Sequence, residues 1–232
     1  MQFTHVTVPS CDPIALAEWY HSVFSLPIET SADGATAFLP DTAVSFAEVD
    51  DHAPYHLAFR SLAPAAAIYE SLQRQDLDGR STPVSVEGEP TIRFDFLDAD
   101  ATYFLDPEGN ILECLAYDRD VDGQNADEHA DRSELMNEAL RSVTEVGLPG
   151  SDPVALREWL IETIGLGTIG SPSPSFAWVG DFEARFVVVP AGREWYPTDR
   201  LSGIDPIEAT VTGAGVTGRH EHPTAPYTVV VE

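Results

Sequence analysis

The chain opens with a segment in which every second residue is apolar, followed by one in which apolar residues recur at three- and four-residue spacing. Residues 4–8, THVTV, show the first pattern, which is typical of a strand with one buried face. Residues 13–24 show the second, and the preceding Asp12 with Pro13 suits a helix start, because Asp caps free N–H groups and Pro fits the first turn. The pattern predicts strand, turn and helix.

The same order of elements is predicted again further along. Strands predicted at 35–40 and 42–49 complete the first unit. A new cycle begins with a strand at 55–61 and a helix at 64–75, and more strand-like segments follow between residues 82 and 117. The first 117 residues therefore predict two successive βαβββ units.

The N-terminal segment recurs 140 residues later. Residues 4–26 and 144–166 align without a gap and share ten identical positions. Strands predicted at 176–180 and 184–190 continue the copy, whereas the last part of the chain has strand-like segments and no predicted helix. We infer an α+β fold of paired βαβββ modules forming curved mixed sheets, with four modules in two domains and the last module degenerate.

The predicted domain boundaries follow from this repeat. Residues 1–117 are expected to form the first domain, with two modules. Residues 118–138 are acidic and lack periodicity, so we expect a solvated linker. Residues 139–232 are expected to form the second, degenerate domain.

The charge balance narrows the environment and the partners. Acidic residues number 39 against 12 basic residues, all of them Arg, which gives a net charge of −27. Such self-repulsion is relieved by concentrated salt, so we predict a halophilic protein in a salt-rich cytoplasm. The surface is expected to repel nucleic acid and anionic membranes.

No apolar run is long enough to cross a bilayer, and the two cysteines, Cys11 and Cys114, are expected to be free thiols.

Three ionisable residues lie on predicted strands opposite apolar neighbours. Alternation directs His5, His56 and Glu113 away from the apolar residues that flank them in sequence. Each side chain thereby shares a face with few or small neighbours. Taken singly, each is also compatible with an ordinary role, such as a hydrogen-bonded strand His or a solvent-facing Glu.

Three segments of the first half resemble the vicinal oxygen chelate superfamily, which includes glyoxalase I, antibiotic-resistance proteins and extradiol dioxygenases. They are HVTVPSCDPIALAEWYHSVFSLPI (5–28), YHLAFR (55–60) and YFLDPEGNILECLAY (103–117). The resemblance implies modules that curl into a cup around a divalent metal, with His5, His56 and Glu113 at the family's ligand positions. Two imidazoles and one carboxylate would form a facial triad with open coordination positions.

A ligand set of His, His and Glu resembles the extradiol dioxygenase pattern more than the four-ligand glyoxalase pattern. This implies Fe or Mn as the metal, with Zn or Ni as alternatives, and a small catechol-type or vicinal-oxygen substrate. Tyr103 stands where ring-cleaving members carry a Tyr that steadies the substrate, although a buried strand aromatic is an equal interpretation. The family's acid–base His is missing before Tyr103, so His52 and Arg60 are the candidate substitutes.

Two other functions stay open on the sequence alone. One is a glyoxalase-like isomerase or lyase, in which a carboxylate moves the proton. The other is a non-catalytic module that sequesters a small molecule.

The expected metal site also falls in the N-terminal half, whereas two-domain dioxygenases keep it in the C-terminal half. Either a monomer or a homodimer is compatible with the duplication.

The second half carries Glu145 at the position of His5, without the other ligands. We therefore expect Glu145 to be solvated and the second half to be a decayed copy that buttresses or covers the first. Trp195 and Tyr196 lie in a loop-like segment that either lines a pocket or packs on the surface.

Overall fold

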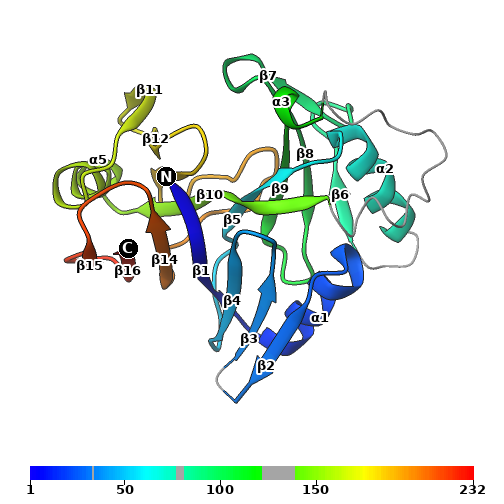
Figure 1. The fold of residues 1–232 in the computed structure, drawn as a ribbon, viewed down its shortest axis with the longest axis horizontal. Coiled ribbons are helices and arrows are strands. Elements are labelled where there is room, and N and C mark those ends of the chain that lie inside the picture. Colours follow the sequence, from blue (N-terminus) through cyan, green and yellow to red (C-terminus); the bar gives the residue numbers. More distant parts are fainter. Residues whose placement is uncertain (33, 77–80, 122–138) are drawn as a thin grey trace.

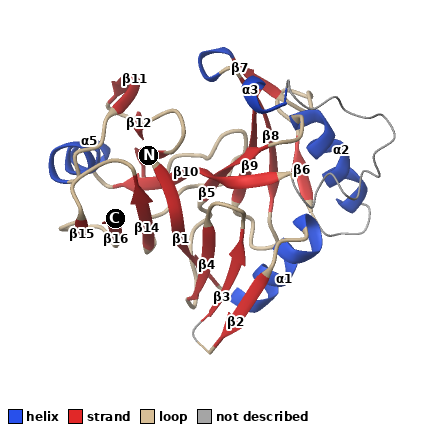
Figure 2. Ribbon diagram, in the orientation of Figure 1, coloured by secondary structure: helices blue, strands red, loops and turns tan. Residues whose placement is uncertain are grey.

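The structure is a computed structural model in which residues 1–32, 34–76, 81–121 and 139–232 are described. Strands dominate, and the helices lie at the outside of the strand layers (Figure 2). Among the described residues, no helix has the length and apolar character needed to cross a membrane. The chain has an α+β fold of curved mixed sheets, as the sequence predicts.

The first module follows the predicted order. Its elements are β1 (Gln2–Ser10), α1 (Pro13–Phe24), β2 (Ile28–Ser31), β3 (Gly34–Phe38) and β4 (Ala43–Glu48). The Asp12 carboxylate caps α1 by accepting a hydrogen bond from the Ala15 amide at 3.1 Å. The helix ends where Ser25 adopts a left-handed conformation. The predicted N-cap is confirmed.

The second module has the same plan with shorter strands at its edge. Its elements are β5 (His56–Ser61), α2 (Ala65–Asp76), β6 (Thr82–Val84), β7 (Ile92–Phe94), β8 (Ala99–Leu105) and β9 (Ile111–Tyr117). A 3₁₀ turn, Asp95–Leu97, joins β7 to β8.

The segment predicted as a linker begins with a short helix, α3 (Asp118–Val121), and residues 122–138 lie outside the described residues. The third module comprises β10 (Leu140–Gly150), α5 (Pro153–Glu158), β11 (Thr168–Ser173), β12 (Phe176–Gly180) and β13 (Arg185–Pro190), and α5 continues as a π-helical segment, Trp159–Thr163. The fourth comprises β14 (Ile207–Thr212), β15 (Gly218–Glu221) and β16 (Tyr227–Val231). Residues 207–231 are all described and contain no helix, so this module is degenerate as predicted.

The strands form two sheets, and each sheet combines strands from both halves of the chain. Sheet A has the order β15-β16-β14-β1-β4-β3-β2, and sheet B has the order β11-β12-β13-β10-β5-β9-β8-β6, with β7 beside β8. The first strands of the modules make the junctions, because β1 pairs antiparallel with β14 and β10 pairs antiparallel with β5 (Figure 1). The first module therefore pairs with the fourth, and the second pairs with the third.

Alternation along sheet B separates a packed face from a concave one. Leu57, Phe59 and Val146 belong to the main core, which they share with sheet A and helix α1. The intervening residues of the same strands face the other way, where Ala58 and Val187 belong to a second apolar cluster. The candidate site lies on this second face.

Candidate metal centre

A single row of side chains crosses sheet B on its concave face. Strand register places Tyr103 of β8 opposite Glu113 of β9, and Glu113 beside Ala58 of β5. The row continues from Ala58 to Glu145 of β10. It ends at Arg185 of β13, which is paired with Glu145. Ala58 is small, so it leaves space between the two carboxylates at the centre of the row.

His56 lies two residues before Ala58 on β5 and projects into that space. Because residues two apart on a strand share a face, His56 lies on the same side as Ala58. Its Nε2 atom is 3.5 Å from Oε2 of Glu113 and 3.6 Å from Oε2 of Glu145. One donor atom from each of the three residues lies within 4.8 Å of the others, and all three side chains are buried.

A cavity of about 250 Å³ opens above the three side chains. Its walls are largely aromatic, with Phe176, Trp178, Trp195 and Tyr196 contributed by the third module and the loop that follows it. The Trp195 ring lies 5.5 Å from the His56 ring, and its Nε1 donates a hydrogen bond to the Pro54 carbonyl at 2.8 Å. Of the two sequence interpretations for Trp195 and Tyr196, the structure supports the lining of a pocket.

Arg185 fixes one of the two carboxylates. It is fully buried, and two of its guanidinium nitrogens donate to Oε1 of Glu145, with Nε at 2.8 Å. A third nitrogen donates to the Phe182 carbonyl at 3.2 Å and to the Tyr117 hydroxyl at 3.3 Å. Since Arg185 occupies Oε1, Glu145 presents Oε2 to His56. The ion pair thus orients a single donor oxygen.

The three groups have displaced pKa values. Burial and the nearby charge of Glu145 raise the pKa of Glu113 to about 8. Burial also disfavours the charged form of Glu145, but the charge of Arg185 and the neighbouring His56 ring outweigh it, so the pKa of Glu145 is lowered. For His56, burial opposes protonation, yet the carboxylates of Glu145 and Glu113 beside its Nε2 raise the pKa. Near neutral pH the metal-free cluster therefore holds protons on Glu113 and His56, which a bound cation would displace.

The donor atoms fit a divalent metal in type and spacing. Donors bound at about 2.1 Å to one ion lie roughly 3.0–3.4 Å apart, depending on geometry. The distances from His56 to Glu113 and Glu145 are close to this range and longer than a normal hydrogen bond. Imidazole suits Zn, Cu, Fe and Ni, and carboxylates suit Mn and Mg. His56, Glu113 and Glu145 together would hold such an ion from one side.

The expectation for His5 requires correction. His5 lies on β1 in sheet A, where it is exposed, and its Nε2 is 2.8 Å from the Ser45 hydroxyl. It does not join His56 and Glu113, because β1 pairs with β14 and β4 and not with β5. Glu145 occupies the corresponding place on β10 beside β5. The expectation of a solvated Glu145 is wrong, since this side chain is 7% exposed.

Tyr103 lies at the site as predicted. It lines the cavity and lies opposite Glu113 across the β8–β9 ladder. Burial and the Glu113 charge raise the pKa of the Tyr103 hydroxyl, so this group is a proton donor in its resting form.

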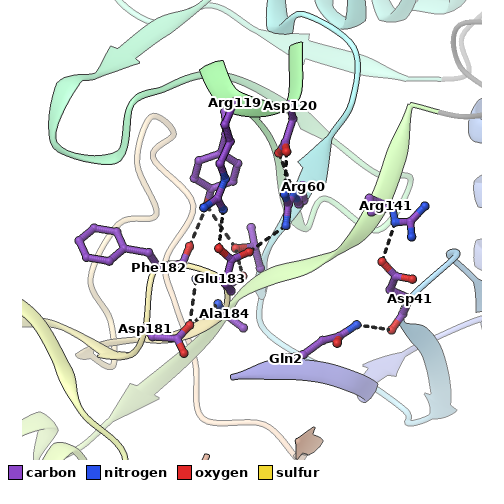
Figure 3. Close-up of polar contacts among 12 residues, drawn as sticks. Gln2, Asp41, Arg60, Arg119, Asp120, Arg141, Asp181, Phe182, Glu183 and Ala184 are labelled. Atoms are coloured by element: carbon purple, nitrogen blue, oxygen red, sulfur yellow. Dashed lines mark hydrogen bonds and ion pairs between the residues drawn. The ribbon is translucent and has the colours of Figure 1, made fainter. Parts of the chain in front are cut away.

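Arg60 does not reach the cavity. Its guanidinium donates to both carboxylate oxygens of Asp120, at 2.7 and 2.6 Å, and to Glu183 at 2.8 Å. Figure 3 shows Arg60 between these two carboxylates, with Arg119 on the other side of Glu183. Arg60 thus joins the end of the first half to the β12–β13 turn, and its charge is already paired.

His52 also lies outside the cavity. Its Nε2 is 2.9 Å from Oε2 of Glu108, in the turn between β8 and β9, and its ring stacks on Tyr55 at 5.9 Å. The structure therefore brings together His56, Glu113 and Tyr103 from the predicted site residues, and leaves His5, His52 and Arg60 elsewhere.

Glu145 and Arg185 were missed as site residues. The register of the repeat carried a signal for Glu145, which stands in the second copy where His5 stands in the first. The signal for Arg185 is weaker. It is the one charged residue of the apolar strand RFVVVP, and a charge buried in such a strand needs an oppositely charged side chain beside it.

Comparisons with known proteins agree on the fold. No protein-family model matches the sequence, and no curated protein matches it. A solved structure named "putative dioxygenase" from Bacillus subtilis subsp. subtilis strain 168 is 14% identical, with a TM-score of 0.60 over 100% of this chain and 85% of the other. A V278E mutant of glyoxalase I from Zea mays is 13% identical, with a TM-score of 0.56 over 99% and 91%.

A third solved structure is about half as long. This glyoxalase/bleomycin resistance protein/dioxygenase family enzyme from Burkholderia phytofirmans PsJN is 13% identical and covers 50% of this chain and 98% of its own, with a TM-score of 0.40. The two longer structures align with nearly the whole of this chain and share its fold. The chain therefore has the fold of the vicinal oxygen chelate superfamily, to which its own sequence motifs point.

Proposed function

We propose that the chain is a divalent-metal-dependent enzyme that acts on a small planar substrate bearing two neighbouring oxygens. The observation that carries the proposal is the convergence of His56, Glu113 and Glu145, from three adjacent strands, at the floor of an aromatic cavity. All three are buried, and burial of two carboxylates side by side is unfavourable without a compensating cation. Arg185 compensates one of them.

The donor set bears on the choice of metal. One imidazole and two carboxylates form a harder site than two imidazoles and one carboxylate, which favours Mn²⁺ or Fe²⁺, with Zn²⁺ and Ni²⁺ as alternatives. The metal would supply charge stabilisation and a template for the two substrate oxygens. Three protein donors on one side leave the cavity side free for the substrate.

The residues of the chain would bind and orient the substrate. The rings of Trp178, Trp195 and Tyr196 offer flat apolar surfaces, which suit a planar ring. Tyr103 stands beside Glu113 with its hydroxyl protonated, so it would donate a hydrogen bond to a substrate oxygen when Glu113 is engaged elsewhere. The burial of His56, Glu113 and Glu145 would limit the access of bulk water to the reacting atoms.

Ring-cleaving oxygenation is the reaction that we place first. The aromatic walls suit a catechol-type ring, and Fe²⁺ or Mn²⁺ suits oxygen chemistry. The acid–base group would come from Tyr103 or Glu113, since neither His52 nor Arg60 lines the cavity.

Isomerisation by proton transfer is a second candidate, favoured by one observation. In the metal-free site the pKa of Glu113 is raised to about 8, so this buried carboxyl would exchange a proton near neutral pH when it is not bound to the metal. In this reaction Glu113 would take a proton from a carbon next to a carbonyl and return it to the neighbouring atom.

Metal-loaded activity separates the two reactions. The protein is loaded anaerobically with Fe²⁺ or Mn²⁺, supplied with a panel of catechols, and followed for oxygen uptake and ring-opened product. The same preparation with Zn²⁺ or Ni²⁺ is supplied with α-ketoaldehyde thiol adducts and followed for isomerised product. Oxygen uptake that the Glu145→Gln variant loses supports ring cleavage, and metal-dependent isomerisation supports the second candidate. Tight binding of both substrate classes without turnover under any metal would refute an enzymatic role.

A further inference from the structure

A second group of metal-binding side chains lies outside sheet B's cavity. It consists of Cys11, His52 and Glu108, one donor atom of each lying within 4.8 Å of the others. Cys11 is in the turn between β1 and α1, His52 is in the loop between β4 and β5, and Glu108 is in the turn between β8 and β9. Three segments distant in sequence therefore meet at this cluster.

The hydrogen bonds of His52 define the state of its ring. Nδ1 lies 2.9 Å from the Ala53 carbonyl oxygen, which only accepts, so Nδ1 carries a proton. Nε2 lies 2.9 Å from the carboxylate oxygen Oε2 of Glu108. One proton between Nε2 and Oε2, or one cation bound to both atoms, must therefore account for this contact. A backbone carbonyl on the remote ring nitrogen is the arrangement usual for a metal-binding histidine.

Glu108 is held in place through its other oxygen. Oε1 accepts hydrogen bonds from the Ser10 hydroxyl at 2.8 Å and from the Asp12 amide at 3.0 Å. These bonds fix the carboxylate so that Oε2 faces His52. The side chain of Glu108 is 14% exposed and that of His52 is 3% exposed, so both are pre-positioned and largely shielded from water.

Cys11 completes the cluster on its solvent side. The residue is exposed, and its Sγ is 3.9 Å from the Asp50 carbonyl. The other cysteine, Cys114, is fully buried in the main core. A thiolate, a carboxylate and a neutral imidazole together carry two negative charges, which match a divalent cation.

We propose that Cys11, His52 and Glu108 bind a thiophilic divalent cation, Zn²⁺ being the best match. Thiolate and imidazole are ligands that Zn²⁺ prefers, and three protein ligands leave a fourth tetrahedral position for water on the exposed side. The ion replaces the proton shared by His52 and Glu108. It ties the β1–α1, β4–β5 and β8–β9 connections together next to the strand that carries His56.

Cobalt spectroscopy tests this site separately from the centre on sheet B. Co²⁺ bound by a thiolate gives a near-ultraviolet sulfur-to-metal charge-transfer absorption. The sheet B centre of His56, Glu113 and Glu145 contains no thiol and cannot give this absorption. The full chain carrying Glu113→Gln, which silences that centre, is titrated anaerobically with Co²⁺. The variants Cys11→Ser, His52→Gln and Glu108→Gln are added in this background, with His5→Gln as a control on an exposed histidine elsewhere.

The expected result is a saturable charge-transfer absorption in the parent and in the His5→Gln control. Cys11→Ser abolishes it, and His52→Gln and Glu108→Gln each weaken Co²⁺ affinity by about tenfold or more. Zn²⁺ displaces Co²⁺ and raises the thermal midpoint of the parent but not of Cys11→Ser. Absence of the absorption, its survival in Cys11→Ser, or unchanged affinity in folded Glu108→Gln overturns the proposal. Circular dichroism of each metal-free variant establishes that it is folded.

Discussion

Oε2 of Glu145 lies 3.6 Å from Nε2 of His56, although the two residues belong to different halves of the duplicated chain. The contact exists because β10 pairs with β5, so the third module completes the site of the second. The second half is therefore more than a cover for the first. It supplies a candidate ligand, the arginine that orients this ligand, and most of the aromatic wall.

Gly147 is expected to be essential for the shape of the site. It lies two residues beyond Glu145 on β10, and a Cβ added there would be 2.6 Å from the Trp195 ring and 3.2 Å from the His56 Cβ. Gly147→Ala should displace both rings and weaken metal binding by about 10- to 100-fold without removing any ligand. Isothermal titration with Mn²⁺ measures the change. Gly167→Ala is the matched control, because an added Cβ there meets one backbone oxygen at 3.4 Å. Equal affinity in the two variants would refute this prediction.

Arg185 is expected to stabilise the fold by neutralising Glu145. Arg185→Met leaves a buried carboxylate without its partner, which should lower the free energy of unfolding by about 3–5 kcal/mol. Urea denaturation in molar KCl measures this loss.

The double variant Arg185→Met/Glu145→Gln tests the cause of that loss. If the unpaired charge is responsible, the double variant should be more stable than Arg185→Met alone. If the double variant instead loses as much stability as the two single variants together, the effect of Arg185→Met comes from lost packing of the arginine side chain.

The stability of the metal-free protein should fall as the pH rises from about 6 to about 9. Glu113 has a native pKa of about 8 against an ordinary 4.5, so the native state holds a proton that the unfolded state has lost. Its contribution is complete below its unfolded pKa and disappears as the pH passes the native pKa. The raised pKa of His56 acts in the same direction. Glu145, with a lowered pKa, contributes above its unfolded pKa and loses this contribution only in acid.

Urea denaturation across this pH range, with metal chelated, checks the slope. The Glu113→Gln variant cannot titrate at this position and should show a smaller decline. An identical decline in the variant would mean that Glu113 is not the titrating group.

Salt should stabilise the protein strongly. The net charge of −27 produces self-repulsion that is screened as the Debye length shortens from about 30 Å at 0.01 M salt to about 3 Å at 1 M. The thermal midpoint should therefore rise from low to molar KCl. Sucrose at the same osmolarity is the control, because it leaves charges unscreened. A midpoint that KCl leaves unchanged would remove the basis for a salt-rich environment.

Local sequence patterns predicted the modules and part of the site. Strand alternation placed His56 and Glu113 on one face, and the register between β5 and β9 brings them together. Asp12 and Pro13 marked the start of α1 through capping chemistry that is local to the turn. Such features depend on residues close in sequence, so one chain suffices to predict them.

The pairing of modules could not be predicted in the same way. Whether β1 or β10 lies beside β5 is decided by packing between residues distant in sequence, and no local pattern records it. Both strands contain the same Thr-x-Val pattern, so His5 and Glu145 are equivalent candidates on the sequence alone. His5 would be the ligand if modules adjacent in sequence paired with each other, whereas the first module pairs with the fourth.

Metal content of matched variants tests the central claim most directly. Each protein carries Cys11→Ser, to remove the second cation site, and is loaded with Mn²⁺ in molar KCl, desalted and analysed by mass spectrometry for manganese per chain. We predict that Glu145→Gln and His56→Ala lose the ion and that His5→Gln keeps it in full. Full manganese in folded Glu145→Gln, or its loss in His5→Gln, would contradict a centre shared between the two halves.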